Sequence, residues 1–393
     1  MERLMGFLHR KLDHFSFDEY LVIFVLCTIF LPFYCSVIAM IGVLGYLMYH
    51  KRMKAILDDV PYSKWVLLAG IISFIVSMIS QNYLGTACSV VILLVFMFIF
   101  FYRSIVNKRL FELLMDACCN ISWFCAIYAF AEYTKIVHRL NYDVFSFIVE
   151  DNPKHRINST FFNANYYAMM LEFIVLICIY KMMQMKTKRR IVFYIATIIV
   201  NLFILYLTGC RTAWIPFVVT IPFLFLMNKR FVYFSMTMSS YAGVVGILLL
   251  KPGIFQRASL FTDFKKRFKI WNCAIEGIKA HPWFGEGPLT YYHIYKQYNG
   301  HPTQHAHSVY LDPLLSYGIV GVLLLGVYFI SNLKEILLML KRRLDLRLCS
   351  LIIACILTVM IHGILDYTIY WNQTAILFLI IMGSSSMYFH KEK

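Results

Sequence analysis

The sequence predicts an all-α polytopic membrane protein with about twelve transmembrane helices. Of its 393 residues, 60% are apolar and only 15% are charged, and the mean hydropathy is +0.67. Soluble domains are about 45–50% apolar and about 25% charged, so this composition excludes both a soluble globular chain and a disordered one. The apolar residues also form runs of about 20 residues, the length at which a helix spans a bilayer. We expect residues 1–393 to form a single integral membrane domain.

The first apolar run, 20–49, is too long for one span. It contains Pro32 near its middle, and Lys/Arg clusters stand at both of its ends, at 10–11 and 51–54. Basic residues at both ends favour a hairpin that returns to the same side of the membrane. Ten further runs each predict one span: 63–80, 84–102, 112–134, 165–183, 191–209, 212–227, 231–250, 308–332, 348–365 and 374–389.

Placing the N-terminus in the cytoplasm puts every short basic loop on one side of the membrane. These segments are 51–54, 103–109, 181–190, 229–230, 334–347 and the tail 391–393. Because cytoplasmic loops are enriched in Lys and Arg, both termini are predicted to be cytoplasmic. Residues 1–19 are polar, so no cleavable signal peptide is expected. The formal charge of +16 then indicates contact with anionic lipids and not with nucleic acid.

Two long segments, 135–164 and 251–306, are predicted on the outer side. The second contains eight Lys/Arg and three Asp/Glu, a net charge of +5, which favours an anionic partner such as a lipid headgroup or a phosphorylated substrate. An amphipathic surface helix that ends near Pro282 is predicted by apolar residues at three- and four-residue steps: Phe264, Phe268, Trp271, Ile275 and Ile278.

Two arginines of the outer side are candidates for binding phosphate. Arg211 lies between two apolar spans with almost no loop, where a charge is costly. Arg267 lies beside the apolar stripe of the surface helix. A guanidinium binds phosphate through its planar fork. The alternatives are a snorkelling arginine at Arg211 and contacts between lipid headgroups and the lysines around Arg267.

His305 and His307 immediately precede the run 308–332. His307 is expected to point into the bundle, because residues at near-helical spacing follow it and the glycines among them allow close helix–helix contact: Leu311, Leu314, Gly318 and Gly321. A histidine there can act as a general base or simply form an interfacial hydrogen bond. A metal pair is the weaker interpretation, since HxH alone has little specificity and only Asp312 lies nearby.

Other polar residues accompany the outer ends of the spans. Asn163 and Asn165 begin one run, with Glu172 two turns below Asn165, and His362 and Asp366 are four positions apart near the end of another. Carboxylates within a membrane are functional candidates, although a structural hydrogen bond explains each equally well. The eleven cysteines contain no CxxC pair, which favours apolar packing over a disulfide framework or a zinc site. No phosphate-binding GxxxxGK[ST] loop is present.

Together these residues resemble the O-antigen ligase and polymerase superfamily of bacterial envelope-glycan enzymes. The resemblance extends from STFFNAN at 159–165 to Asp366, and its most specific parts are HPWFGEG at 281–287 and HAHS at 305–308. The runs around Arg211 and Arg267 match the two arginine positions of the family. Ala164 departs from it, because proline is common there. The ligase pattern of His, Asn/Ser/Gln, nine residues, Gly, two residues and Gly is met by His307, Ser308, Gly318 and Gly321.

The resemblance implies a GT-C-like transferase of the bacterial cytoplasmic membrane that uses neither a nucleotide sugar, a cofactor nor a metal. Its donor would be a glycan on undecaprenyl pyrophosphate, and its acceptor a hydroxyl of a glycan or lipid at the outer face, with 251–306 contributing to the site. A flippase or transporter of the same lipid-linked glycan and a non-enzymatic scaffold are the alternatives, and ligase and polymerase are not distinguished. The residues implied are His307, Arg211 and Arg267 for catalysis, and Asn163, Asn165, His281, His305 and Asp366 for substrate binding.

Overall fold

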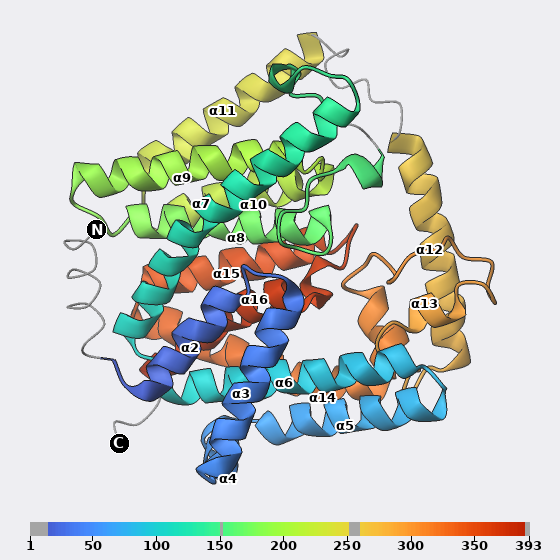
Figure 1. Cartoon of the computed structure of the whole chain (residues 1–393). Helices are drawn as coiled ribbons and strands as arrows, with labels where there is room; N and C mark the ends of the chain where they lie inside the picture. Colours follow the sequence, from blue (N-terminus) through green and yellow to red (C-terminus); the bar gives the residue numbers. More distant parts are fainter. Residues whose placement is uncertain (1–14, 150–151, 251–259, 390–393) are drawn as a thin grey trace.

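The computed structural model describes residues 15–149, 152–250 and 260–389 (Figure 1), without the side chains of 248 and 260–263. The basic cluster at 10–11, the tail 391–393 and the start of the outer segment, 251–259, therefore lie outside the described residues. Within the described part, every regular element is a helix and no strand occurs. The all-α class predicted from the sequence is confirmed.

The first apolar run folds as two helices that separate at Pro32. They are α2 (Phe17–Thr28) and α3 (Phe33–Tyr49). Ser16 begins α2 as the N-cap of a capping box with Glu19, which satisfies two backbone N–H groups that have no partner within the helix. Asp18 of α2 pairs with Arg52, just beyond α3, at 2.7 Å. The beginning and the end of this run therefore lie side by side, as a hairpin requires.

Each of the ten further apolar runs coincides with a helix. After the short α4 (Met53–Asp59), the helices are α5 (Ser63–Ile79), α6 (Tyr83–Ile105), α7 (Lys108–Arg139), α8 (Ala164–Met182), α9 (Lys188–Leu207), η3 (Arg211–Trp214) with α10 (Ile215–Met227), α11 (Phe231–Leu250), α14 (Leu311–Arg342), α15 (Leu346–His362), and α16 (Asn372–Gly383) with η6 (Ser384–Tyr388). The outer segments add η1 (Val144–Ser146), η2 (Pro153–His155), α12 (Leu260–Ala280) and α13 (Thr290–Ile294), and η5 (Thr368–Tyr370) precedes α16.

Five of the described helices, α6, α7, α8, α9 and α14, are long and apolar enough to cross a membrane alone. A sixth span results if α3 and α4, which are bent by 102° relative to each other, count as one. Shorter apolar helical segments are Ser63–Ile79 (α5), Arg211–Met227 (η3 with α10), Phe231–Ile247 of α11, and Leu346–His362 (α15). The chain is thus a membrane protein, and its number of spans stays a prediction of about twelve.

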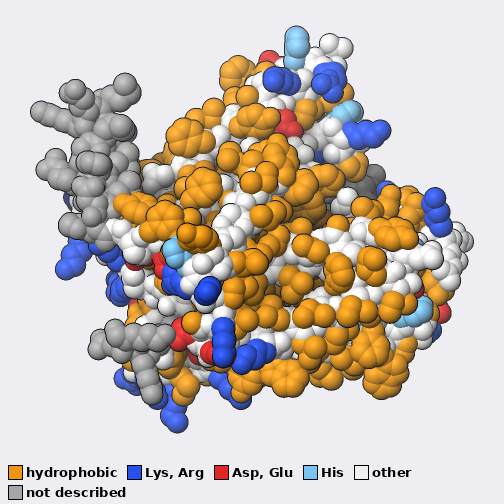
Figure 2. Space-filling view, turned by 60° about the horizontal axis from the view of Figure 1, so that its bottom comes forward, with side chains coloured by type: hydrophobic (Ala, Val, Ile, Leu, Met, Phe, Trp, Pro, Cys, Tyr) orange, Lys and Arg blue, Asp and Glu red, His pale blue; other side chains and the backbone are white. Residues whose placement is uncertain are grey.

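The loops that the sequence assigns to the cytoplasm lie together at one end of the bundle. One ion pair joins two of these loops directly, Lys108 to Asp345 at 3.3 Å, and two others connect Arg52 to Asp18 of α2 at 2.7 Å and Lys181 to Glu112 of α7 at 2.6 Å. Figure 2 shows apolar side chains over the middle of one face and charged side chains toward its ends. An apolar belt between two charged ends is the surface that a bilayer requires.

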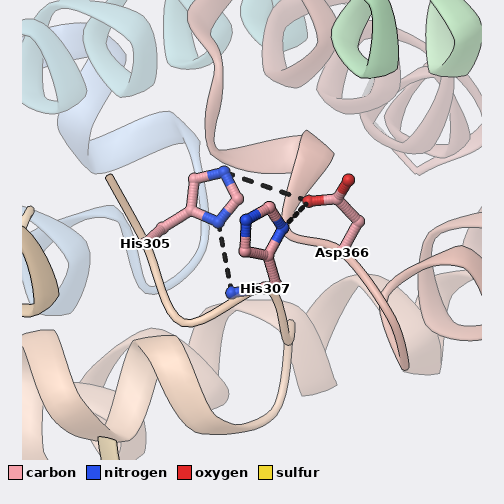
Figure 3. Close-up of side chains that lie close together, drawn as sticks. All are labelled: His305, His307 and Asp366. Carbon is pink, nitrogen blue, oxygen red and sulfur yellow. Dashed lines mark hydrogen bonds and ion pairs between the residues drawn. The ribbon is translucent and has the colours of Figure 1, made fainter. Parts of the chain in front are cut away.

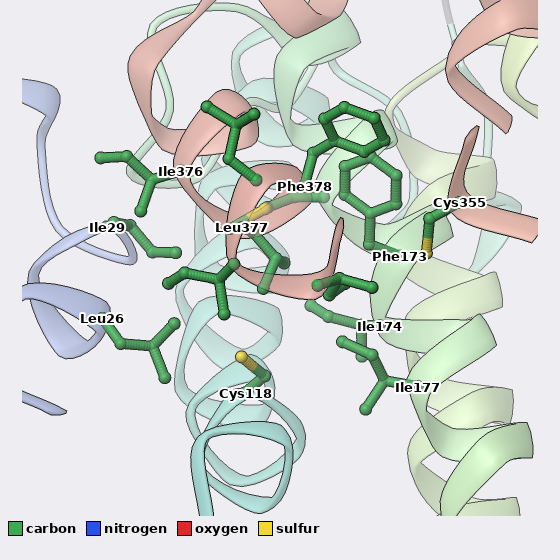
Figure 4. Packing of buried hydrophobic residues seen from close by; sticks show 14 of the residues in the cluster. Leu26, Ile29, Cys118, Phe173, Ile174, Ile177, Cys355, Ile376, Leu377 and Phe378 are labelled. Carbon is green, nitrogen blue, oxygen red and sulfur yellow. The ribbon is translucent and has the colours of Figure 1, made fainter. Parts of the chain in front are cut away.

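Helix α8 forms the centre of the bundle. Its Phe173, Ile174 and Ile177 are at most 1% exposed. They pack with residues of four other helices in the same cluster (Figure 4): Leu26 of α2 and Ile29 just after it, Cys118 of α7, Cys355 of α15, and Ile376, Leu377 and Phe378 of α16. All eleven cysteines are free, and Cys118 and Cys355 act as small apolar residues in this core.

Helix α12 lies across the end of the bundle instead of along it (Figure 1). Ile270, Cys273 and Ala274 are buried in a cluster with residues of α13, α14 and the loop between them. The predicted stripe divides: Trp271 and Ile278 pack against this cluster, whereas Phe264, Phe268 and Ile275 are 44%, 57% and 39% exposed. The face that meets the rest of the protein is a second apolar face, formed by Ile270, Cys273 and Ala274 and turned by about a third of a turn from the predicted stripe. Only the part of the stripe next to this face is covered.

Candidate functional site

Four loops meet at the end of the bundle opposite the basic loops. They precede α8, α10, α14 and α16, and backbone and side-chain hydrogen bonds join them. Arg156 donates to the carbonyl of Thr208 at 2.7 Å, and the N–H of Val309 donates to the carbonyl of Gly363 at 2.8 Å. Asn165 donates to Asp366, across 201 positions of sequence. These loops bring together most of the polar residues selected from the sequence.

The segment around His307 is fixed by its own backbone contacts. His307 has φ 48°, and α14 begins only at Leu311, so His307 lies in the turn before the helix. Asp312 accepts a hydrogen bond from the N–H of Ala306 at 2.6 Å and one from Ser316 at 3.2 Å. The backbone of 305–307 is thereby tied to the first turns of α14.

His307 and Asp366 form the closest pair of the site (Figure 3). Nδ1 of His307 lies 2.8 Å from Oδ1 of Asp366, and Asp366 is 1% exposed while His307 is 21% exposed. The N–H of Tyr367 donates to the same oxygen at 2.8 Å, and Asn165 donates to the other. His305 lies beside His307 on the same side of the carboxyl: the two ring centroids are 4.4 Å apart, and Nε2 of His305 is 3.9 Å from Oδ1. The carboxyl is therefore held from three directions.

The charges around the two partners of His307 favour an ionised Asp366 and a neutral His305. Burial alone raises the pKa of Asp366, but the charge and hydrogen bond of His307 and the charges of His305 and Arg267 outweigh it, so the pKa lies well below its usual range. Burial, together with the charges of His307 and Arg267, lowers the pKa of His305 to about 3 against the attraction of Asp366. His305 Nδ1 accepts from the N–H of His307 at 3.2 Å, as only an uncharged ring can.

This arrangement leaves one nitrogen of His307 available as a base. With the proton on Nδ1 directed to the ionised Asp366, Nε2 carries a lone pair. In the structure Nε2 lies 2.9 Å from the hydroxyl of Thr303, and in this tautomer the hydroxyl is the donor. A histidine oriented by a buried carboxylate and partly open to solvent can take a proton from a hydroxyl.

The same three side chains could also hold a metal ion. His305, His307 and Asp366 each offer one ligand atom, and these atoms lie within 4.8 Å of one another. Two imidazoles and a carboxylate are a donor set that Zn²⁺ accepts when its fourth position stays open. A metal would have to replace the hydrogen bond between His307 and Asp366, which already satisfies both groups.

Arg211 begins η3, directly between α9 and α10, and is half-buried. A buried pair lies behind it: His362 Nδ1 is 2.8 Å from Glu172 Oε2, and both side chains are 0% exposed. The other ring nitrogen of His362 lies 3.3 Å from the hydroxyl of Thr212. The pair thus supports the turn that carries Arg211, and the sequence had singled out both of its members.

Arg267 is half-buried on α12, on the edge of the face that contacts the rest of the site. Its Nη1 is buried and has no hydrogen-bond partner among the described residues. A buried donor without an acceptor is rare in proteins. The next turn of α12 contributes Ile270 to the cluster that contains Ala306, and the charge of Arg267 acts on both His305 and Asp366. The guanidinium is therefore near the His307 pair and can accept an anionic ligand.

Asn163 and Asn165 have different positions. Asn163 is exposed and caps α8, its Oδ1 accepting from the N–H of Asn165 at 2.8 Å. Asn165 is half-buried and bridges Asp366 to Arg156, whose Nη2 donates to Asn165 Oδ1 at 2.6 Å. Arg156 was not identified from the sequence. The only available signal was a basic residue in the outer segment a few positions before the asparagines.

His281 lies apart from this cluster. It follows the C-terminal end of α12, about 21 Å along that helix from Arg267, and its Nε2 is 3.1 Å from Glu286 with 55% of the side chain exposed. The structure thus does not bring His281 to His307. Its role in substrate binding stays a prediction.

The motif at 281–287 packs its backbone against α14. Gly318 has φ 61° within that helix, and a Cβ there would lie 2.4 Å from the backbone of Trp283. The N–H groups of Ile319 and Val320 donate to the carbonyls of Pro282 and Trp283 at 2.9 and 3.0 Å. Gly318 therefore permits close contact with a loop, where the sequence had predicted contact with a helix.

Residues 196–326 match the model of a protein family described as O-antigen ligase. The match includes Arg211, Arg267, His281, His305 and His307, whereas Asn163, Asn165 and Asp366 lie outside it. No curated protein matches the chain. The resemblance to the O-antigen ligase superfamily is thereby confirmed, and a ligase- or polymerase-like role in cell-surface glycan synthesis is supported.

Proposed function

We propose that the chain is a membrane glycosyltransferase that moves a glycan from undecaprenyl pyrophosphate to an acceptor hydroxyl at the outer face of the bacterial cytoplasmic membrane. The observation that carries the proposal is the hydrogen bond of 2.8 Å between His307 and the buried Asp366, beside segments that hold Arg211 and Arg267. A base and two guanidinium groups are what a transfer from a pyrophosphate donor needs.

In the proposed reaction, the acceptor hydroxyl takes the place of the Thr303 hydroxyl at His307 Nε2. The acceptor oxygen forms a bond to the anomeric carbon of the donor sugar while the bond from that carbon to the pyrophosphate oxygen breaks. The hydroxyl proton moves to Nε2, and the ionised Asp366 stabilises the imidazolium that results. Undecaprenyl pyrophosphate leaves with the bonding electron pair.

The two arginines stabilise the charge that grows on the leaving group. A pyrophosphate oxygen would supply the acceptor that buried Nη1 of Arg267 lacks among the described residues. Arg211, on the turn supported by His362 and Glu172, would bind from the opposite loop. Guanidinium groups fixed before the reaction stabilise developing negative charge without reorganisation, which is the role of a metal ion in other transferases. The proposed reaction is therefore metal-independent.

The remaining candidates divide by their contacts. Exposed Asn163 and the ring of His305 are proposed to contact the substrate. Asn165 and Asp366 are proposed to orient His307, since their polar atoms bond to each other and to that histidine. The position of His281 beside Glu286 favours a role outside the reacting centre.

The topology that accompanies this function places the site end of the bundle outside and the basic end in the cytoplasm. The gathering of the basic loops at one end supports it, because cytoplasmic loops carry excess Lys and Arg. The position of α12 across the site end fits a helix on the outer membrane surface. The residues around α12 in 251–306 would then meet both lipid headgroups and the substrate.

The decisive experiment is reconstitution in nanodiscs with an undecaprenyl-pyrophosphate oligosaccharide and excess EDTA, with the glycan resolved on a gel. A ladder of repeat lengths would identify a polymerase, and a single shift that needs an added lipid or polymer acceptor would identify a ligase. Activity that EDTA removes and Zn²⁺ restores would contradict the metal-independent mechanism. No transfer, together with donor movement across a liposome bilayer, would identify a transporter.

A further inference from the structure

Arg156 joins two parts of the site that the sequence motifs treat separately. Its Nε donates to the carbonyl of Thr208 at 2.7 Å, and its Nη2 donates to Oδ1 of Asn165 at 2.6 Å. Thr208 stands three positions before Arg211, and Asn165 donates to Asp366. One guanidinium therefore contacts the loop of Arg211 on one side and the support of His307 on the other.

Among the described residues, the hydrogen-bond acceptors of the Arg156 guanidinium are neutral groups. Both of its acceptors are uncharged oxygens, and none of the ion pairs formed by the described residues includes it. The buried cations at the other end of the bundle differ, since Arg103 pairs with Glu335 and Lys181 with Glu112. A half-buried cation without a carboxylate is costly near a membrane and favours an anionic ligand.

The guanidinium also has donors to spare. Arginine carries five N–H groups in a rigid fork, and the described contacts of Arg156 use one at Nε and one at Nη2. The guanidinium also lies close to the backbone of the Arg211 loop. Gly209 has φ 66°, and a Cβ at this position would lie 3.4 Å from Nε of Arg156. Glycine at this position lets the loop of Arg211 approach the guanidinium closely.

We propose that Arg156 is a third arginine of the donor site and that its free N–H groups bind the pyrophosphate of the prenyl-linked donor together with Arg211. The inference rests on the proposed function, because the ligand is the leaving group of that reaction. It also gives Arg156 a second effect. A phosphate bound to this guanidinium changes its hydrogen bond to Asn165. Through Asn165 it changes the position of the Asp366 carboxyl, which orients His307.

The test measures ligand binding by the full-length protein in nanodiscs, with farnesyl pyrophosphate, farnesyl monophosphate and farnesol as probes. Arg156→Gln is expected to weaken binding of the pyrophosphate at least tenfold, to weaken the monophosphate less, and to leave farnesol unchanged. Lys154→Gln is the matched control, because this exposed residue lies two positions away and carries the same charge. It is expected to change none of the three affinities.

A second variant covers the case in which Arg156→Gln disturbs the loop. Arg156→Lys keeps the charge but loses the fork, and it is expected to recover part of the pyrophosphate affinity with a wild-type melting temperature. An equal loss for all three probes in both variants would show that Arg156 only holds the loop, and would overturn the proposal. Unchanged pyrophosphate affinity in Arg156→Gln would do the same.

The proposed function and this inference fail in different ways. If the wild-type protein binds farnesyl pyrophosphate no more tightly than farnesol, the donor class is wrong and both fail. If the wild type prefers the pyrophosphate and Arg156→Gln keeps that preference, the inference fails while the proposed function stands.

Discussion

His307 and Asp366 are 59 positions apart in the sequence and meet through a hydrogen bond of 2.8 Å. Each partner is held by a different part of the chain: Thr303 contacts the free nitrogen of His307, and Asn165 contacts the second oxygen of Asp366. The orientation of the histidine therefore depends on several loops at once. Substitutions at these positions therefore have different effects: one removes the base itself, and another changes which of its nitrogens carries the proton.

Removing the base should remove the reaction and leave the fold. His307→Ala is expected to lower glycan transfer by roughly 10²–10⁴-fold, the usual contribution of a general base, with an unchanged melting temperature in detergent. His293→Ala is the control, because that exposed histidine lies on α13, away from the pair. Full activity in His307→Ala would exclude the histidine from the mechanism.

Asp366→Asn preserves the size of the side chain but reverses its hydrogen bonding. An amide N–H directed at Nδ1 would make that nitrogen an acceptor and move the ring proton to Nε2, so the base would be lost. We expect the maximal rate of transfer to fall at least about 100-fold with little change in KM. Initial rates over a range of donor concentrations measure both. A rise in KM alone would instead indicate that Asp366 binds substrate.

Arg211→Lys tests whether the fork is needed. An ammonium keeps the charge but cannot bind two phosphate oxygens in one plane, so most of the transfer activity should be lost. Arg189→Lys, at an exposed position of the basic end, should have no effect on the same gel assay. A normal rate for Arg211→Lys would mean that this arginine only contacts lipid headgroups.

Gly318→Ala should destabilise the protein, because φ 61° and a backbone contact at 2.4 Å leave no room for a Cβ. Left-handed strain alone costs about 1–3 kcal/mol, and the displaced 281–287 segment adds to it. Gly326→Ala lies in the same helix with nothing within 4 Å of its Cβ, and should be neutral. Thermal unfolding in detergent compares the two, and equal melting temperatures would contradict the close contact.

The protein should lose stability in acid through His305. Burial and neighbouring charges lower its pKa from the ordinary 6.5 to about 3, so the folded state binds fewer protons than the unfolded state between these values. The contribution of neutral His305 to the free energy of unfolding is therefore fully present above the ordinary pKa, and it is lost as the pH drops toward the pKa of the folded state. His305→Gln should flatten the dependence of the melting temperature on pH between about 6.5 and 4. An unchanged slope would assign the acid sensitivity to other groups.

The main helices of the bundle could be located from the sequence because each coincides with a continuous apolar run, although α7 and α14 extend beyond theirs to Arg139 and Arg342. Their boundaries follow from breaks such as Pro32, which is the N-cap of α3. The exposure of individual faces could not be derived in this way. On α12, the stripe of Phe264 and Phe268 and the face of Ile270 are both apolar, and periodicity alone does not distinguish a face that meets lipid from one that meets protein.

The contacts of the site were harder to predict than its members. His307, Asn165 and Asp366 could each be selected as polar residues at span ends, but their meeting depends on how three loops fold. Arg156 carries no local pattern and acquires its place only from Thr208 and Asn165. His281 shows the opposite case, since it belongs to a specific motif whose packing partner is the backbone around Gly318.

The position of α12 has a consequence for any assay of this protein. Its Ile270 face is anchored in protein, while Phe264 and Phe268 face outward at 44% and 57% exposure. If α12 lies on the outer membrane surface as proposed, lateral pressure and acyl-chain order in the surrounding lipid would act on those rings and, through the helix, on the position of Arg267. Bilayer thickness would then be one of the variables that set the geometry of the site, and a micelle would not reproduce it.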